Sequence, residues 1–473
     1  MPKCGKKMLK FLGWTAVAVV AVLSVLAFYL FVGGFDTAKP VDDSALRIVL
    51  QDFPDEDNAF VALLDATNHY AVSRDGSVEL DDRMFVVGYG IAFTNGNRCA
   101  SAARLMPDAG ERADRLLASN AACIAAVKDA VSRRGYRCTI KPTSRLGNIA
   151  FSTLGKFADF AILLRLKAQR ELERGDAEAA AGTTEVIHRL GDILTKFSDS
   201  SFAYSIGCSI RDMAYGKMSD IVALGQDTDE MLERFSRIAA EDDATAEEMR
   251  RRAVMVDYSR YVRGAEAISV EGLDEPTMDG LYFLAPTRVD VAAFSCVIRW
   301  PGFARFALHR RATTAKLFDY AGNVLAEREA KAPISVPLCC LLPNCIGDGI
   351  VCLFAIDRGT TESAAGDDAS ARTHVRLVLA AAKWRRKNGG ALPPTLDALV
   401  PDYLDAVPVD PSHKERPLSY DPETGVVSKG IVWKVVENDD ESGAKAGNRT
   451  SLRKRLKDPF RIDGRPVGPI ELP

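Results

Sequence analysis

An uncharged run of 22 residues near the N-terminus, residues 11–32, constrains this chain more than any other feature. About 20 apolar residues suffice for a helix to cross a bilayer, whereas the apolar core of a cleaved signal peptide has only about 7–15. The run therefore predicts an uncleaved transmembrane helix whose partner is the lipid bilayer. A cleaved signal peptide is the alternative, because Ala27 stands where a small-residue cleavage site would end.

Charged residues on either side of this run predict its orientation. Four lysines precede the run and three aspartates follow it: Lys3, Lys6, Lys7, Lys10, Asp36, Asp42 and Asp43. Because basic residues stay on the cytoplasmic side of a membrane, we expect a single-pass protein of the cell inner membrane. Its N-terminus would be cytoplasmic and the bulk of the chain periplasmic.

The length and charge of the chain limit its architecture and partners. A chain of 473 residues is too long for one ordinary core, so several folding units are expected. A hydrophobic content of 47% is typical of a folded protein, and a net charge of -3 gives no bias toward nucleic acid. We therefore expect protein partners and no nucleic acid.

Nine of the ten cysteines follow the apolar run, in a compartment where disulfides form. Four of them are close together in the sequence: Cys339, Cys340, Cys345 and Cys352. Their neighbours are apolar and no histidine is near, whereas zinc sites usually show paired C-x2-4-C knuckles. Buried or disulfide-bonded cysteines are favoured, and a metal site is the alternative.

Apolar residues recur at helical spacing through residues 144–267. One apolar stripe with steps of three and four residues consists of Leu154, Phe157, Ala161, Leu164, Ala168 and Leu172. Gly175 then ends this helix and Asp176 caps the next one, which predicts a helical hairpin. Further starts are indicated by Asp227-x-x-Glu230 and by Thr245-x-x-Glu248, which have the spacing of a capping box.

Residues 268–369 are less regular. The apolar run at residues 336–356 is long enough for a second membrane span, but it contains two prolines and its downstream flank is acidic. A buried strand pair is therefore favoured there, and the polar residues 357–370 are expected to form a linker. Residues 83–94 are expected to form either a strand pair or one strand with a bend at a glycine.

Several closely spaced prolines predict tight turns and a compact arrangement near the C-terminus. Residues 371–387 have the pattern of an amphipathic helix, which Asn388 and the following glycine end. Two prolines stop further helix, so we expect a one-turn helix capped by Thr395 that packs Leu396 and Leu399 back onto the first helix. Two strands are expected next, joined at residues 422–425.

The order of these features resembles the globular part of the major pseudopilins of type II secretion systems. The resemblance covers about residues 370–430, from the Ala-rich helix through "GGALPPTLDALVPDYLDAVPVDP" to "LSYDPETGVVSKG". The whole layout also resembles a group of uncharacterised bacterial membrane-anchored proteins. Those share the anchor, a "DEDNAF"-like segment, a "GDAEAA" hairpin and this C-terminal segment, and no activity follows from them.

Several departures separate this chain from a working pilin subunit. A pilin anchor continues directly into the globular helix, whereas these two segments are far apart here. Prepilin processing requires a glutamate five residues after a glycine, and Ala18 stands at that distance from Gly13. Major pseudopilins also carry a calcium loop, for which the candidates here are Asp439, Asp440 and Glu441. An ordinary solvated acidic turn is the favoured interpretation of these three residues.

No catalytic motif stands out from the sequence. Phosphate-binding, zinc-protease and serine-nucleophile signatures are missing, and the five histidines are isolated. The basic run at residues 449–457 is typical of a solvated tail. We therefore expect no catalytic residue and no cofactor. The favoured function is a non-enzymatic envelope scaffold or protein-interaction module; the alternatives are an extracytoplasmic hydrolase or an accessory subunit of a type II secretion-like assembly.

Together these patterns predict an α+β chain with an N-terminal transmembrane helix, a central domain of helical hairpins and a small pseudopilin-like α+β unit. The expected parts are a cytoplasmic tip and anchor (1–34), a mixed α/β segment (35–143), a helical domain (144–267), a mixed segment with a linker (268–369), the pseudopilin-like unit (370–436) and a charged tail (437–473).

Overall fold

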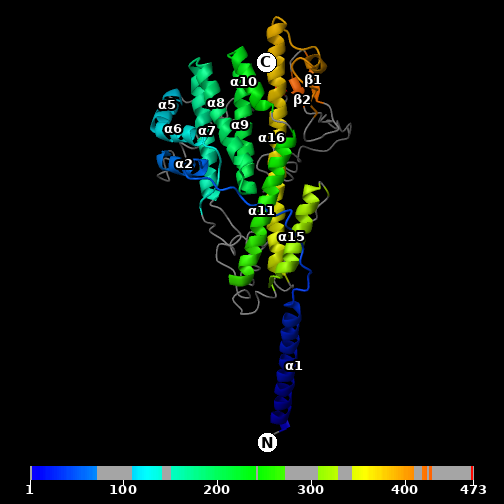
Figure 1. Cartoon of the computed structure of the whole chain (residues 1–473). Helices are drawn as coiled ribbons and strands as arrows, with labels where there is room; N and C mark the ends of the chain where they lie inside the picture. Colours follow the sequence, from blue (N-terminus) through cyan, green and yellow to red (C-terminus); the bar gives the residue numbers. More distant parts are fainter. Residues whose placement is uncertain are drawn as a thin grey trace, which may run out of the picture.

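The computed structural model describes an elongated bundle of helices (Figure 1). The described residues are 3–71, 109–140, 151–240, 243–271, 307–326, 328, 344–409, 418–422, 426–428 and 470–471. Helix makes up 74% of the structure, and its strands are only two or three residues long. The predicted α+β class is therefore wrong. Residues 345–356, expected in a strand pair, and residues 357–370, expected to form a linker, belong to a long helix instead. The strand pair or bent strand expected at residues 83–94 lies outside the described residues.

The helices have the following bounds: α1 Lys3–Gly33, α2 Ala59–Ala66, α5 Ala109–Ser119, α6 Ala121–Ala130, α7 Phe151–Glu173, α8 Ala177–Lys196, α9 Ser201–Ala223, α10 Asp229–Ala239, α11 Asp243–Glu271, α15 Arg310–Leu325 and α16 Cys345–Lys387. Two short 3-10 helices are η1 Thr67–His69 and η3 Leu396–Leu399. The strands are β1 Ser419–Asp421, β2 Val426–Ser428 and β3 Ile470–Glu471.

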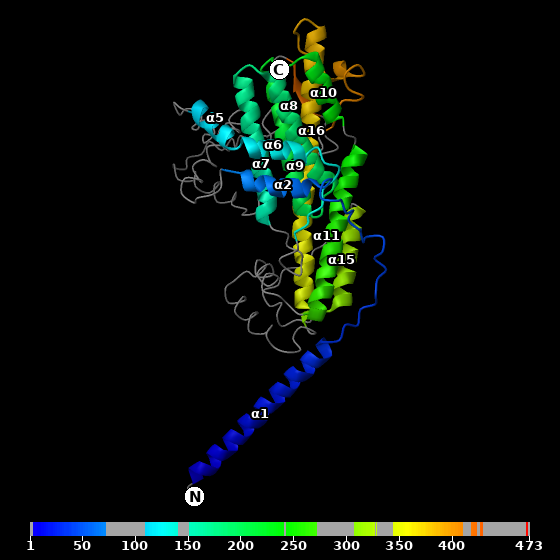
Figure 2. The same cartoon turned by 60° about the vertical axis from the view of Figure 1, so that its left-hand side comes forward.

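Helix α1 projects from one end of the bundle (Figures 1 and 2). Its large apolar side chains from Trp14 to Val32 are exposed wherever the structure describes them. In the described part of the chain, no helix combines the length and the apolar character that a membrane span requires. This finding overturns the predicted transmembrane anchor over residues 11–32 and the single-pass inner-membrane location.

Local capping signals place several helix starts. The Asp176 carboxylate accepts a hydrogen bond from the Ala179 amide at 3.0 Å, which confirms the predicted N-cap of α8. Helix α10 is capped by Thr228, one residue after the predicted position, and α11 already begins at Asp243. Asn58 caps α2 by accepting from the Phe60 amide at 3.0 Å.

Helices α7, α8 and α9 lie side by side and form the middle of the bundle (Figure 1). The predicted apolar stripe of α7 is buried along its whole length. Helices α2 and α6 cover one side of this layer, where Phe60 makes edge-to-face ring contacts with Tyr136 at 5.6 Å and Phe157 at 5.9 Å. One continuous apolar core therefore joins the N-terminal helices to the central layer.

Helix α16 is 43 residues long and connects two further cores. Its N-terminal half packs against α11 and α15, and its C-terminal half packs against α9 and α10. The predicted strand pair at residues 336–356 is wrong from Cys345 onward, and the predicted linker at residues 357–370 is wrong as well. The reason is tertiary packing, because small residues of the middle of α16, Ala364 and Ala365, fit closely against α9 and α11.

The C-terminal elements pack on the last turns of α16. Leu396 and Leu399 of η3 are buried in one cluster with Val375 and Val378 of α16, as the sequence predicts. Strands β1 and β2 pair antiparallel with Tyr420 opposite Val427, and β3 pairs with the other edge of β2. The same apolar cluster includes Phe235 of α10, so these elements share their core with the helical bundle.

Candidate functional site

An open groove on the C-terminal elements is the first candidate site. It has a volume of about 410 Å³ and is lined by residues 394–397 and 407–409 together with Leu418 and Tyr420. We call it the C-terminal groove. Its volume lies within the about 300–1,000 Å³ that is usual for ligand sites, and its lining is mostly proline, leucine and valine. The groove can therefore accept apolar side chains.

Backbone turns place the two walls of the C-terminal groove opposite each other. Gly389 and Gly390 have positive φ angles of 63° and 90°, which reverse the chain after α16. The Tyr420 hydroxyl then donates a hydrogen bond to the Pro393 carbonyl at 2.7 Å and ties β1 to the proline turn. Leu399 and Leu404 are buried in the same apolar cluster as Leu396 and Leu418, which line the groove.

One carboxylate lines the C-terminal groove, and two more are nearby in the sequence. Asp397 lines the groove and is exposed, and Asp402 and Asp405 are exposed in the same proline-rich segment. Residues 391–409 contain no lysine and no arginine. At the end of α16, Arg386 forms ion pairs with Asp227 and with Asp229, the first residue of α10. Lys387 lies over the ring of Tyr403, which belongs to the proline-rich segment. Among the residues that line the groove, Asp397 alone is charged.

Buried carboxylates form a second candidate site, at the start of α9. Both Asp257 oxygens accept from the Ser201 amide at 3.2 Å, and the Arg260 guanidinium lies 3.1 Å from Asp257. Arg260 also contacts Asp357 of α16 at 2.7 Å. Burial raises the pKa of Asp257 to about 6; Asp357 adds to the rise and Arg260 opposes it.

Asp199 is the second buried carboxylate of this region. It accepts from the Cys138 amide at 3.0 Å, and burial raises its pKa. Carboxylates with shifted pKa values often mark catalytic sites. Asp199, however, is only 5% exposed and Asp257 only 1% exposed. Their partners are backbone amides and arginines of neighbouring segments. Their raised pKa values therefore reflect a structural role that joins α6, α9 and α11.

A polar seam also links α8, α9 and α16. Arg211 of α9 lies 3.1 Å from Asp368 of α16 and donates to the Tyr215 hydroxyl at 3.1 Å. The Tyr215 hydroxyl is 3.4 Å from Nε2 of His188 on α8. Burial lowers the pKa of His188 to about 3, and Arg211 lowers it further, so this imidazole is neutral. The seam fixes how the three helices pack.

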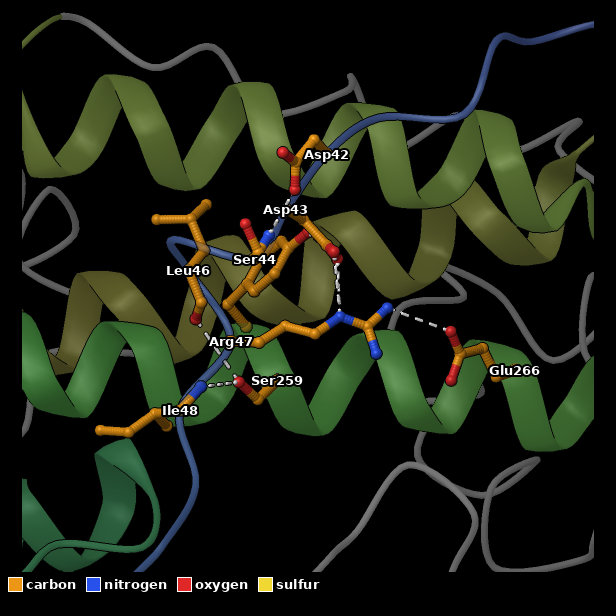
Figure 3. A network of polar contacts seen from close by, with 9 residues as sticks. Asp42, Asp43, Ser44, Leu46, Arg47, Ile48, Ser259 and Glu266 are labelled. Carbon is orange, nitrogen blue, oxygen red and sulfur yellow. Dashed lines mark hydrogen bonds and ion pairs between the residues drawn. The ribbon is translucent and has the colours of Figure 1, made fainter.

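The segment after α1 forms a strap, residues 36–48, that lies across α11 and α15. Figure 3 shows Arg47 between two carboxylates, with Nε 3.0 Å from Asp43 and Nη2 3.1 Å from Glu266 of α11. The Ile48 amide donates to the Ser259 hydroxyl at 3.0 Å. Leu46 inserts its side chain into the core of α11, α15 and α16. The strap is therefore an integral part of the bundle.

Further contacts hold the strap in place at Asp43 and at Asp36. Tyr258 of α11 donates to Asp43 at 2.8 Å, so Asp43 binds two partners at once. Asp36 accepts from the amides of Arg311 at 2.6 Å and Ala312 at 3.3 Å. These amides belong to the first turn of α15, whose own N-cap residue makes no side-chain capping bond. Asp36 thus caps α15 from a distant part of the chain.

Several residues singled out from the sequence lie outside the described residues or apart from one another. Asp439, Asp440 and Glu441, the calcium candidates, fall outside the described residues. Cys339 and Cys340 do so as well, while Cys345 and Cys352 lie on α16. Within the described ranges, no group of three or more histidine, cysteine, aspartate or glutamate side chains is arranged to hold a metal ion.

Sequence reasoning missed the buried carboxylates and the groove. Asp199 accepts from Cys138, 61 residues away, and Asp257 accepts from Ser201, 56 residues away, so only the tertiary packing forms these contacts. The prolines of the groove were recognised only as turn residues.

No family model, curated protein or solved structure matches this chain.

Proposed function

We propose that this chain is a protein-interaction scaffold, in which a stiff helical body presents the C-terminal groove to a partner protein. The observation that carries the proposal is the course of α16. This single helix begins in the core of α11 and α15, and its C-terminal half shares an apolar cluster with Leu396 and Leu418, which line the groove. A partner held in the groove would therefore be held at a fixed position relative to the far end of the bundle.

Ion pairs between helices support a stiff body. The Arg211–Asp368 pair is buried and joins α9 to α16, and Arg260 bridges Asp257 of α11 and Asp357 of α16. Removal of one member of such a pair strongly destabilises a protein, because the other charge is then left buried and unpaired. They therefore oppose sliding of these helices along each other.

The order of the C-terminal elements supports a narrower candidate. An Ala-rich helix end, a proline turn with the one-turn helix η3, and the β1–β2 hairpin follow one another as in the pseudopilin resemblance. An accessory subunit of a type II secretion-like assembly is the corresponding function. No contact of the described residues favours a hydrolase, since the perturbed carboxylates are closed off from substrate.

Site-specific photo-crosslinking in cells tests the scaffold proposal. A crosslinking amino acid replaces Val409, which lines the groove and is 51% exposed, and in a matched control it replaces Val270 on α11, which is 82% exposed. We expect one defined crosslinked partner from Val409 that co-purifies with the full chain, and none from Val270. Equal labelling from both positions, or no product from Val409, would contradict the proposal.

A further inference from the structure

We propose that Asn388 is a site of spontaneous modification, at which the side-chain amide is converted to a carboxylate through a cyclic imide. Asn388 directly follows the last residue of α16, and Gly389 comes next. Asparagine is among the thermolabile residues, and the only reactant needed besides the chain itself is water. The inference concerns the turn that leads from α16 to the C-terminal groove, and it does not depend on the scaffold function.

The reaction begins when the Gly389 backbone nitrogen attacks the side-chain carbon Cγ of Asn388. The nitrogen loses its proton and forms a bond to Cγ, the bond from Cγ to the side-chain nitrogen breaks, and ammonia leaves. Water then opens the cyclic imide at either of its carbonyl carbons. The product is aspartate or isoaspartate, and the net change is the uptake of water and the release of ammonia.

The attacking backbone amide is accessible. Hydrogen bonds occupy the amides on either side of it, because Asn388 donates to the Trp384 carbonyl at 2.9 Å and Gly390 donates to the Arg385 carbonyl at 2.8 Å. Among the described residues, no hydrogen bond uses the Gly389 amide, and Gly389 is exposed. A Cβ atom added to Gly389 would meet nothing within 4 Å, so no group beyond the adjacent residues crowds this glycine.

The side chain that is attacked is held by an exposed hydrogen bond. Nδ2 of Asn388 donates to the Trp384 carbonyl at 2.9 Å, and the same oxygen already accepts the Asn388 backbone amide. Water replaces an exposed hydrogen bond at little cost in free energy. The Asn388 side chain can therefore leave this carbonyl and turn its Cγ toward the Gly389 nitrogen.

A cation next to the turn favours the attack. Nε of Arg385 donates to the Gly390 carbonyl at 3.4 Å, which places the guanidinium beside the reacting residues. Negative charge develops on the Gly389 nitrogen as its proton leaves, and then on the side-chain oxygen of Asn388. A positive charge that is already in place stabilises both.

The product is expected to loosen the end of α16. Nδ2 of Asn388 donates to the Trp384 carbonyl, whereas a carboxylate can only accept a hydrogen bond. Its negative charge is also unfavourable at the C-terminal end of a helix. Isoaspartate in addition lengthens the main chain within the turn that Gly389 and Gly390 form with their positive φ angles.

Peptide mapping of the full chain by mass spectrometry tests this inference. The chain is incubated in heavy-oxygen water in mildly alkaline and in mildly acidic buffer, so that conversion during incubation is distinguished from conversion during digestion. We expect Asn388 to become aspartate and isoaspartate that carry heavy oxygen, faster in the alkaline buffer. Asn68 is the control within the same sample, because it is exposed as well but is followed by His69, whose side chain hinders attack by its amide. Equal conversion at both sites, or an intact Asn388, would overturn the inference.

Matched variants test the part that the structure assigns to the turn. Arg385→Gln should slow the conversion about two- to fivefold, the range expected for one partly exposed charge. Arg376→Gln removes a cation of the same helix away from the turn and should leave the rate unchanged. Equal rates in both variants would contradict the role of the cation. A second Asn-Gly pair, at residues 95–96, lies outside the described residues, and peptide mapping separates the two sites.

Hydrogen exchange measures the consequence for the fold. Asn388→Asp reproduces one product, and we expect faster exchange at residues 384–392 than in the unaltered chain. Asn388→Gln keeps a side-chain amide that can donate to the Trp384 carbonyl, so its exchange should stay close to that of the unaltered chain. This variant should also block the reaction, because its longer side chain would have to close a larger ring. Conversion of Asn388→Gln at the rate of the unaltered chain would sink the proposal.

Discussion

Gly191 of α8 and Gly207 of α9 face each other where these two helices cross. A Cβ atom added to Gly191 would lie 2.7 Å from the Gly207 carbonyl oxygen, and one added to Gly207 would lie 2.8 Å from the Gly191 carbonyl oxygen. Backbone atoms cannot move aside as a flexible side chain can. The close crossing of α8 and α9 therefore requires glycine at both positions.

Alanine at either position is expected to destabilise the fold. Gly191→Ala and Gly207→Ala should each lower the free energy of unfolding by about 1–3 kcal/mol through overpacking. Gly182→Ala on α8 and Gly216→Ala on α9 are the controls, since an added Cβ meets nothing within 4 Å at these positions. The controls should raise stability by about 0.5–1 kcal/mol, because glycine is unfavourable inside a helix. Chemical denaturation measures all four variants, and equal effects would contradict the close crossing.

Truncation of Leu399 is expected to disturb more than the C-terminal elements. Leu399 is fully buried in the core that η3 shares with α10 and α16, so Leu399→Ala should cost about 2–5 kcal/mol. Hydrogen exchange should then rise both at residues 396–404 and in α10. The partly buried Val400 is the control, and Val400→Ala should have a smaller effect. Faster exchange confined to the C-terminal elements would mean that they unfold as a separate unit.

Stability is expected to depend on pH through Asp257. Burial raises its pKa from 3.8 to about 6, so the folded state binds this proton more strongly than the unfolded state does. The stabilising contribution is therefore complete below pH 3.8 and is lost as the pH rises through about 6. The Tm should rise when the pH falls from 7 to 5, and Asp257→Asn should reduce this rise. Scanning calorimetry with Asp319→Asn as control checks the sign, and an unchanged pH profile in Asp257→Asn would refute it.

Removal of the Asp36 carboxylate is expected to loosen the start of α15. Asp36 accepts from the Arg311 and Ala312 amides, so Asp36→Ala should cost about 0.5–2 kcal/mol, the usual range for a lost N-cap. Hydrogen exchange should increase in the first turn of α15, and Asp36→Asn should largely restore protection. Asp42→Ala is the control, because Asp42 is exposed and hydrogen-bonds to Ser44, only two residues away. Equal exchange in both alanine variants would exclude the capping role.

The helical residues 151–240 could be predicted because their signals are local. Apolar residues at steps of three and four define the buried side of α7, and Asp176 caps α8 through a bond that spans three residues. The turn at the end of α16 and the one-turn helix η3 followed from glycine and proline chemistry within a few residues. In these segments short-range preference and the tertiary fold agree.

Long-range packing determined the parts of the structure that the local sequence does not predict. Residues 357–370 have the small and polar composition of a linker, yet they are helical because Ala364 and Ala365 pack against α9 and α11 and Asp368 reaches Arg211. The contact of Asp257 with the start of α9 joins residues 56 positions apart, and no local pattern encodes it. The walls of the groove likewise come together through a long-range contact, the hydrogen bond from the Tyr420 hydroxyl to the Pro393 carbonyl. Local sequence therefore determined where most helices of residues 151–240 begin and end, whereas the length of α16, the buried charges and the groove depended on contacts that form only after the chain has folded.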